Sequence, residues 1–233
     1  MTDQPVVVIL GAGMGGRGVA TALTGKAHLA IVDRDQDFAQ AAADPVNAAG
    51  GSAEATVVDL ADLAAVEAFR DDLLSRYGRV DAVVHLVGGW AGSATVDAQA
   101  IEQFQQLLPG TVTTVQTTSV AFRDALMAAP AGRYFMVTSA AARSPKQNVA
   151  AYTASKGAAE HWVQALGDSF NGTPARSVIL AVIALVDAAT REKNPDKAFA
   201  NFTDVVELGT AVWDQIDGDP DQGAYIDLSP GNR

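Results

Sequence analysis

A tyrosine, a lysine and a serine stand at a spacing that supports acid–base chemistry. Tyr152 and Lys156 are four residues apart in an alanine-rich segment, which places them one turn apart on the same face of a helix. A lysine ammonium beside a phenol favours the phenolate, so we expect the pKa of Tyr152 to lie below its ordinary value near 10. Ser139 lies 13 residues before Tyr152, at the end of an apolar run, where its hydroxyl could polarise a carbonyl oxygen. Together the three residues predict an acid–base centre that acts near neutral pH.

A glycine-rich segment follows the first apolar run of the chain. Gly11, Gly13 and Gly16 match the pattern G-x-G-x-x-G. The first glycine allows a tight turn, the second lets a pyrophosphate approach the backbone, and the third lets a helix pack closely on a strand. A helix that begins here presents amide donors and its positive dipole end to the phosphates. We therefore expect a dinucleotide site whose phosphate loop also includes Met14 and Gly15.

An acidic residue ends the second apolar run. Asp33 lies 22 residues after Gly11, where a carboxylate accepts hydrogen bonds from an adenosine ribose. A carboxylate at this position repels the 2′-phosphate of NADP, so Asp33 favours NAD as the cofactor. Arg34 or Arg17 could instead hold that phosphate, which leaves NADP open. S-adenosylmethionine methyltransferases also combine a glycine-rich turn with an acidic residue after the second strand, but they would have no role for the tyrosine–lysine pair.

Short β-branched runs alternate with longer alanine-rich stretches along the chain, so we expect a single α/β domain, residues 1–233. The runs are nearly continuous in apolar residues, as expected of strands that helices cover on both faces. This pattern predicts a Rossmann-type, doubly wound parallel sheet of about seven strands. The expected strands are Val6–Leu10, Leu29–Val32, Ala55–Val58, Ala82–Val87, Tyr134–Thr138, Val178–Leu185 and Ala224–Leu228. The expected helices include Asp62–Arg76, Val112–Ala129 and Ala150–Phe170.

Composition and charge exclude several classes of function. The chain has no cysteine, which rules out disulfides, thiol nucleophiles and thiolate metal sites, and with three histidines we expect no metal site. A formal net charge of −11 repels phosphate backbones, so nucleic acid is not an expected partner. No apolar segment reaches the roughly 18 residues of a membrane span, and no basic region precedes the first strand as in a signal peptide. We therefore expect a cytoplasmic protein that acts on a small molecule.

Taken together, these motifs resemble the short-chain dehydrogenase/reductase family over essentially the whole chain. The resemblance implies that Tyr152 donates and accepts the proton, that Lys156 binds the nicotinamide ribose, and that Ser139 positions the substrate carbonyl. It also implies cofactor contacts from residues that follow the third and fourth strands, namely Asp59, Leu60, Val87 and Gly88. Family members use the helix that carries the tyrosine in subunit contacts, so the resemblance implies a homodimer or homotetramer with Trp162 as a candidate contact.

The sequence departs from the family pattern at several positions. Leu10 stands in place of the threonine of the family's glycine motif, and His85-Leu86-Val87-Gly88 stands in place of its Asn-Asn-Ala-Gly segment. Thr111 aligns by spacing with the asparagine of the family's proton relay, so a threonine would have to hold the relay water here. We expect His85, which ends an apolar run, to be a hydrogen-bonded core residue rather than a catalyst.

Two local segments are similar to one subgroup, dihydropteridine reductase, which reduces quinonoid dihydropterin with NADH. They are Gly88–Gly92, in which Trp90 could offer a flat face to a pterin ring, and Asp187–Arg191. That subgroup lacks the catalytic serine, whereas Ser139 is present here, so the resemblance covers these segments better than the chemistry.

The sequence therefore predicts an NAD(P)-dependent oxidoreductase that transfers a hydride between nicotinamide and a carbonyl or imine carbon. A dihydropteridine reductase acting on a pterin-like substrate is the alternative within this class. A nucleotide-binding sensor that has kept the fold and lost catalysis is the alternative in another class, because Thr111 and the altered segment at His85–Gly88 depart from the catalytic pattern.

Overall fold

In a computed structural model, which describes residues 4–231, seven parallel strands form one central sheet. Their order across the sheet is β3-β2-β1-β4-β5-β6-β9, which confirms the predicted doubly wound Rossmann-type architecture. The strands are β1 (Val6–Leu10), β2 (His28–Asp33), β3 (Ser52–Val57), β4 (Ala82–His85), β5 (Arg133–Ser139), β6 (Arg176–Val182) and β9 (Ala224–Asp227). Strands β1, β4 and β5 are buried along their whole length, as their continuous apolar sequences require.

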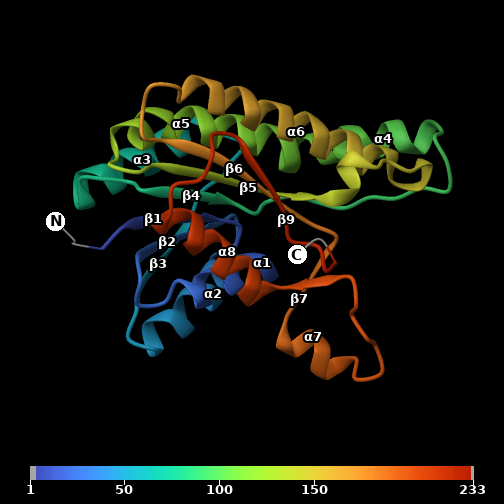
Figure 1. Cartoon of the computed structure of the whole chain (residues 1–233), viewed down its shortest axis with the longest axis horizontal. Helices are drawn as coiled ribbons and strands as arrows, with labels where there is room; N and C mark the ends of the chain where they lie inside the picture. Colours follow the sequence, from blue (N-terminus) through green and yellow to red (C-terminus); the bar gives the residue numbers. More distant parts are fainter. Residues whose placement is uncertain (1–3, 232–233) are drawn as a thin grey trace.

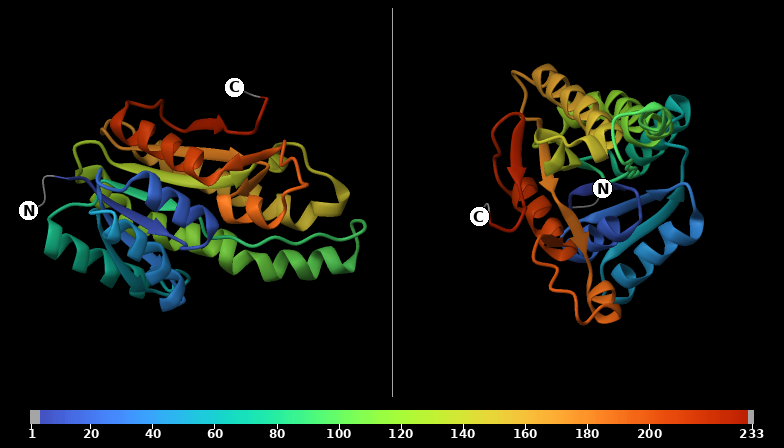
Figure 2. Two further views of the ribbon diagram at one scale, coloured as in Figure 1. Left: turned by 90° about the horizontal axis from the view of Figure 1, so that it is seen from below. Right: turned by 90° about the vertical axis from the view of Figure 1, so that its right-hand side faces the viewer.

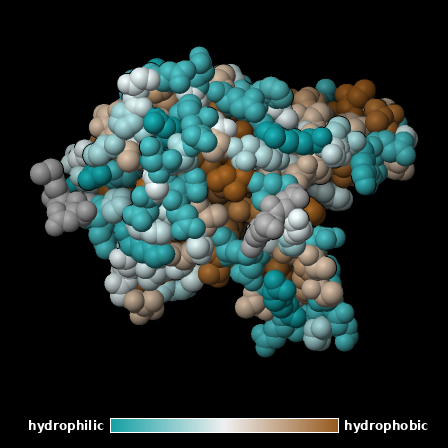
Figure 3. All heavy atoms as spheres, viewed as in Figure 1, coloured by the Kyte–Doolittle hydropathy of each residue, from teal (hydrophilic) through white to brown (hydrophobic). Residues whose placement is uncertain are grey.

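Helices cover both faces of the sheet, so the core has two halves (Figures 1 and 2). On one face α3 (Leu63–Tyr77), α5 (Thr114–Ala128) and α6 (Ala150–Ser169) pack their apolar side chains on the sheet. On the other face α1 (Met14–Ala22), α2 (Gln36–Ala48) and α8 (Val205–Asp217) do the same. Figure 3 shows that the outer surface in this view is mostly hydrophilic, with hydrophobic residues gathered between the two layers and over α4 (Ala98–Leu108). None of the helices in residues 4–231 combines the length and apolar character that spanning a membrane requires.

Helices α1 and α8 approach each other through two glycines. A Cβ atom at Gly18 would lie 2.3 Å from the Cβ atom of Val205, and one at Gly209 would lie 2.5 Å from the Cβ atom of Ala22. Both distances are too short for any side chain, so glycine is required where the two helices touch. This contact fixes α1, and with it the glycine-rich loop that precedes the helix.

A small lobe projects from the end of β6 (Figure 1). It contains β7 (Ala184–Val186), α7 (Ala188–Lys193) and β8 (Phe202–Asp204), with β7 and β8 paired in parallel. The strand that the sequence predicted over Val178–Leu185 is therefore wrong in its extent. The pairing with β5 ends at Val182, and the exposed Ile183 separates the central sheet from the lobe.

The predicted helix Val112–Ala129 also differs from the structure. Helical backbone begins at Ala98 and runs through α4, the short π-helix η1 (Pro109–Thr113) and α5 without a loop. Pro109 and Gly110 suggest a break in the sequence, because proline has no N–H to donate. The wider π-turn accommodates the missing donor, and such turns are frequent at functional sites.

The strand order reverses between β1 and β4, which lie side by side. Leu10 is paired with His85, so the loops that leave these two strands lie next to each other. Ligands of open α/β sheets bind in the crevice beyond the carboxyl ends of the strands at this point. The fold therefore brings the glycine-rich loop and the segment after His85 to one place.

Candidate active site

The glycine-rich loop is a compact turn that closes on itself. Gly11 has a φ of +99°, which favours glycine, and its amide donates to the carbonyl of Val32 at 2.8 Å. A Cβ atom at Gly16 would lie 2.0 Å from the carbonyl oxygen of Gly11, so helix α1 can start here only with glycine at this position. A Cβ atom at Gly13 would meet nothing within 4 Å, which leaves the loop open on the side of the cavity described below. Gly13 is also the N-cap of α1 and provides no side-chain cap, so the first amides of the helix are available to an anion.

The carboxylate of Asp33 ties this loop to the end of β2. Its Oδ2 atom accepts a hydrogen bond from the amide of Ala12 at 2.8 Å, and its Oδ1 atom accepts one from the amide of Asp35 at 3.3 Å. Asp33 is half-buried, whereas the neighbouring Arg34 is exposed. The acidic residue expected at an adenosine ribose thus also holds the phosphate loop in place.

A cavity of about 640 Å³ opens beside the loop at the switch point of the sheet. Its lining includes every residue that the sequence predicted to contact the cofactor outside the acid–base centre: Gly11, Gly13, Met14, Gly15, Gly16, Asp33, Arg34, Asp59, Leu60, Val87 and Gly88. It also includes residues that sequence reasoning missed, among them Gln106, Leu107, Pro109, Gly110, Thr114, Val137 and Leu185. The signal that could have found most of these is the Pro109-Gly110 pair, which marks the π-turn at the rim of the cavity.

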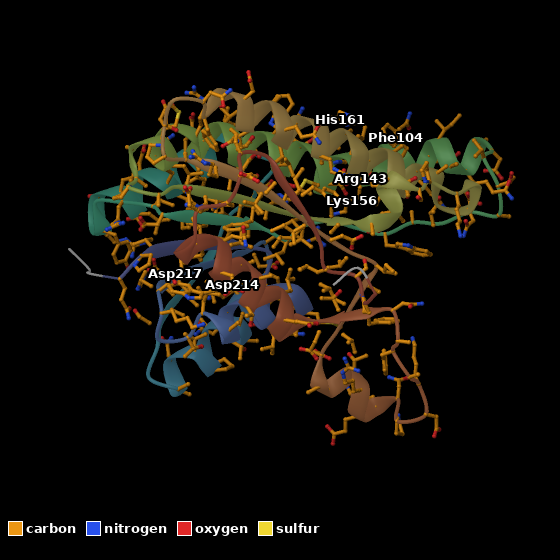
Figure 4. The ribbon with its side chains drawn as sticks, viewed as in Figure 1. Phe104, Arg143, Lys156, His161, Asp214 and Asp217 are labelled. Atoms are coloured by element: carbon orange, nitrogen blue, oxygen red, sulfur yellow. The ribbon has the colours of Figure 1, made fainter. Side chains whose placement is uncertain are left out.

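Ser139, Tyr152 and Lys156 come together between the end of β5 and the start of α6. Ser139 is buried and accepts a hydrogen bond from the amide of Ala141 at 3.3 Å, and its side chain acts to lower the pKa of Tyr152. The Lys156 side chain is only 7% exposed, and its Nζ atom donates to the carbonyl of Val137 at 3.2 Å. Val137 lines the cavity, whereas Ser139, Tyr152 and Lys156 are not among its lining residues, so the acid–base residues stand at its border. Figure 4 shows Lys156 on the side of α6 that faces the sheet.

The protonation of the tyrosine–lysine pair differs from the prediction. Burial raises the pKa of Tyr152 above its ordinary value, and the hydrogen bond from Ser139 opposes this rise only in part. Burial lowers the pKa of Lys156 to about 8, while the carboxylate of Glu160 acts in the opposite direction. The expected lowering of the tyrosine pKa by the lysine is therefore wrong for this structure, because burial dominates and Lys156 is not among the groups that act on the pKa of Tyr152. Tyr152 is accordingly a neutral phenol at neutral pH and carries a proton that it can donate.

A small polar space separates Lys156 from η1 and from the loop after β4. A Cβ atom at Gly88 would lie 3.0 Å from Lys156 Nζ and 3.9 Å from Thr111 Oγ1, which shows that both atoms border Gly88. Thr111 is buried, and its hydroxyl has no hydrogen-bond partner among the described residues. A buried hydroxyl without a partner is costly unless a water or a ligand satisfies it.

His85, the last residue of β4, is held as a core residue. Its Nε2 atom lies 3.0 Å from Thr114 Oγ1, and the Thr114 hydroxyl donates to the carbonyl of Gly110 at 2.9 Å. The hydroxyl has one proton, so the proton of the His85–Thr114 bond belongs to Nε2. Burial, followed by the charge of Lys156, lowers the pKa of His85 to about 3. The imidazole is therefore neutral at physiological pH.

Trp90 lies in the segment between β4 and α4 and does not line the cavity. Its side chain is 71% exposed, and its ring packs over Gly92, where a Cβ atom would lie 3.0 Å from Trp90 Cη2. The segment is held in place because Gln103 donates to the carbonyl of Gly92 at 2.9 Å and the amide of Ser93 donates to the carbonyl of Asn148 at 3.0 Å. Trp90 thus presents an uncovered aromatic face at the surface.

Trp162, the expected subunit contact, lies on the outer side of α6. It is partly exposed, and its indole N–H donates to the hydroxyl of Ser119 on α5 at 2.9 Å. Among the described residues, no group of three or more histidine, aspartate or glutamate side chains is arranged to hold a metal ion.

Comparisons with known proteins agree with this geometry. A family model described as short chain dehydrogenase matches residues 5–197. The probable oxidoreductase EphD of Mycobacterium tuberculosis is 34% identical over 156 residues, which cover 66% of this chain and 26% of that protein. The 2,3-dihydro-2,3-dihydroxybenzoate dehydrogenase of Bacillus subtilis is 29% identical over 167 residues, covering 71% of this chain and 64% of that protein. The chain thus spans about a quarter of the length of EphD.

Solved structures share the fold. An NAD⁺-bound xylitol dehydrogenase superposes with a TM-score of 0.86 at 18% identity, covering 97% of this chain and 98% of that chain. A metagenomic short-chain oxidoreductase in complex with NADP superposes with a TM-score of 0.81 at 22% identity, covering 98% of both chains. These likenesses show the architecture, and they include one structure with each form of the dinucleotide.

Proposed function

The chain belongs to the short-chain dehydrogenase family, and from that membership we propose that it is an NAD(P)-dependent oxidoreductase in which Tyr152 is the acid–base residue. The observation that carries this proposal is the convergence of two groups of residues at one cavity. The glycine-rich loop and Asp33 line the cavity, and Lys156 reaches its border, where it donates to the lining residue Val137 and lies beside the lining residue Gly88.

The residues at the cavity fit a dinucleotide. The first amides of α1 have no side-chain cap and would hold the pyrophosphate, and Gly13 leaves room for it. Lys156 has three N–H donors, of which one is used by Val137, so two remain for the nicotinamide ribose. When bound, the nicotinamide supplies or accepts the hydride.

The acid–base residues have distinct roles in this proposal. In carbonyl reduction, the Ser139 hydroxyl donates a hydrogen bond to the substrate oxygen and Tyr152 transfers its phenolic proton to that oxygen. The raised pKa of Tyr152 keeps this proton in place before the substrate binds. The Lys156 ammonium, when positioned next to the phenol, stabilises the phenolate that remains.

We propose NAD as the preferred form of the cofactor. Asp33 presents a negative charge at the position of the adenosine ribose and already accepts a hydrogen bond from Ala12, which holds the carboxylate at the edge of the cavity. A 2′-phosphate would meet this charge directly. The exposed Arg34 is the residue on which NADP binding would depend instead.

A pterin-like substrate is a second candidate, and the exposed ring of Trp90 favours it. At 71% exposure this ring has a free face on which a flat heterocycle could stack. Assay with quinonoid dihydropterin and NADH separates this candidate from a carbonyl reductase. Turnover of carbonyl compounds with none of the pterin would reject it.

The experiment that tests the proposed function is a thermal-shift titration with NADH, NADPH and S-adenosylmethionine, followed by turnover on a panel of carbonyl and pterin substrates. A ligand at about 100 times its Kd stabilises the folded state by about 2.7 kcal/mol. We expect NADH to raise Tm more than NADPH, and S-adenosylmethionine to leave it unchanged. A shift with S-adenosylmethionine alone would contradict the proposal, and cofactor binding without any turnover would favour a sensor. The cytoplasmic location and the homo-oligomer remain predictions from the sequence.

A further inference from the structure

Three consecutive residues at the end of β5 are each tied to a polar side chain of α6. The carbonyl of Val137 accepts from Lys156, the hydroxyl of Thr138 donates to Glu160, and the side chain of Ser139 acts on the pKa of Tyr152. Two of these ties belong to the acid–base residues already described. The third, between Thr138 and Glu160, has no role in the proposed function so far.

Glu160 is a buried carboxylate one helical turn after Lys156. It is 5% exposed, and its Oε1 atom accepts a hydrogen bond from Thr138 Oγ1 at 2.6 Å. Its Oε2 atom lies 3.9 Å from Nε of Arg143, whose guanidinium carbon is centred 3.2 Å over the ring of Tyr225 on β9. Figure 4 shows both Arg143 and Lys156 on the side of α6 that faces the sheet. A carboxylate is rarely buried to this degree unless charge or hydrogen bonding compensates it.

The charge of Glu160 acts on Lys156. Side chains four residues apart lie on the same face of a helix, with their Cβ atoms roughly 5–6 Å apart. Burial destabilises the ammonium of Lys156, and Glu160 is the group that opposes this effect. The other titratable groups in the network are Tyr152 on α6, His85 on β4, Arg143 after β5 and Tyr225 on β9.

We propose that Glu160 is a positioning residue of the reaction, in which a carboxylate fixed by Thr138 keeps the Lys156 ammonium charged inside the buried site. The effect on the ammonium rests on the burial of both groups and on their i, i+4 spacing on α6, whereas its catalytic consequence rests on the proposed function. A purely structural role, in which Glu160 only fastens α6 to β5, makes different predictions because it depends on the hydrogen bond and not on the charge.

The variant Glu160→Gln separates the two roles. The amide oxygen of glutamine can still accept the hydrogen bond from Thr138, but the negative charge is lost. Asp168→Asn is the matched control, because it makes the same change at an exposed position of the same helix, where the carboxylate contacts only Asn171 among the hydrogen bonds of its side chain. Circular dichroism and thermal melting establish that each variant is folded.

The first measurement is independent of any enzymatic activity. The pH dependence of the ¹³Cε chemical shift of Lys156, followed by NMR in the free protein, reports the titration midpoint of the ammonium. We expect the midpoint to fall by about one pH unit in Glu160→Gln, because an opposite charge within one helical turn is removed. We expect it to be unchanged in Asp168→Asn. The same midpoint in wild type and Glu160→Gln overturns the proposal.

The second measurement links the charge to turnover. The alkaline limb of the pH profile of kcat/KM is expected to move down by about one unit in Glu160→Gln, with activity near pH 6 close to that of wild type. Glu160→Asp retains the charge and is expected to restore the limb to within a few tenths of a unit. If Glu160→Gln does not fold, Glu160→Met tests the same idea, because it removes the same charge with an unbranched side chain of similar length and should lower the midpoint in the same direction.

The outcomes also distinguish the two proposals. A shifted Lys156 midpoint in a protein that neither binds nor uses a nicotinamide cofactor would leave the inference intact and contradict the proposed function. An active wild-type enzyme whose Lys156 midpoint is the same as in Glu160→Gln would support the proposed function and overturn the inference.

Discussion

The ammonium nitrogen of Lys156 lies 3.2 Å from the backbone carbonyl oxygen of Val137 and donates a hydrogen bond to it. Val137 lines the same cavity as the glycine-rich loop. This single contact therefore joins the acid–base helix to the cofactor cavity. Because Lys156 is only 7% exposed, the loss of water around its ammonium lowers its pKa to about 8.

The two central glycines of the loop should separate folding from binding. Gly16→Ala forces a methyl group to within 2.0 Å of the Gly11 carbonyl, so we expect the free energy of unfolding to fall by about 3 kcal/mol or more. Gly13→Ala meets no atom within 4 Å, so its stability should stay within about 1 kcal/mol of wild type. The added methyl should nevertheless weaken NADH binding at least about tenfold, because the pyrophosphate approaches the backbone there. Urea unfolding and NADH fluorescence titration measure the two effects, and unaltered binding by Gly13→Ala would place the pyrophosphate elsewhere.

Asp33→Asn should alter the preference between the two forms of the cofactor. The asparagine oxygen can still accept from the Ala12 amide, so the loop should remain intact while the charge is lost. Hydrogen bonds to a charged group contribute about 1.5–3 kcal/mol, so we expect the Kd for NADH to rise about tenfold or more, and that for NADPH to fall. Arg34→Ala serves as the control and should change the NADH affinity less than about twofold. Tighter binding of NADPH than NADH by wild type, lost in Arg34→Ala, would reverse the assignment.

His85 should make the folded state sensitive to acid. Its pKa is lowered to about 3 in the folded state, whereas in the unfolded chain it lies near 6.5. Below about pH 6.5 the unfolded state therefore binds a proton at His85 that the folded state does not bind, so the free energy of unfolding decreases as the pH decreases. Between pH 7 and pH 5, wild type should lose about 2 kcal/mol more than His85→Gln in denaturant unfolding. Equal losses in both proteins would show that His85 is not held neutral.

Thr111→Val tests whether the buried hydroxyl has a role in proton transfer. The hydroxyl has no partner among the described residues, so its removal should leave stability unchanged or slightly higher. If it holds a water next to Lys156, as its position beside Gly88 suggests, kcat should fall about tenfold while the Kd for NADH stays the same. A kcat equal to that of wild type would show that protons leave the site by another route.

The sequence predicted the parts of this protein that depend on local chemistry. A dinucleotide turn needs glycine at fixed offsets, and parallel strands covered on both faces need continuous apolar runs. The glycine-rich loop, the place of Asp33 at the end of the second strand and the order of the elements could therefore be predicted from the sequence. The ends of the strands were harder to predict. β6 ends before Ile183 because its pairing with β5 stops at Val182, and this depends on the neighbouring strand and not on the β propensity of the residues.

The electrostatic details could not be predicted in the same way. The spacing of Tyr152 and Lys156 indicates that they share a helix face but does not reveal how deeply the helix is buried, so the direction of the tyrosine pKa was wrong. The hydrogen-bond partner of Lys156 is a backbone carbonyl, and because every residue has one, the residue types in the sequence do not indicate which carbonyl accepts the bond. Thr138 and Glu160 are 22 positions apart and meet only when α6 packs on β5. The π-helix at Pro109 similarly depends on how α4 and α5 pack.

The replacement Tyr152→Phe tests the central claim most directly, because it removes one hydroxyl and leaves the ring in place. The measurement is steady-state turnover, with the carbonyl or pterin compound that wild type uses best, together with NADH binding by fluorescence. General acid–base catalysis typically contributes about 10²- to 10⁴-fold, so kcat should fall by that factor while the Kd for NADH stays within about twofold. Turnover by Tyr152→Phe within about threefold of wild type would contradict the assignment of Tyr152 as the acid–base residue.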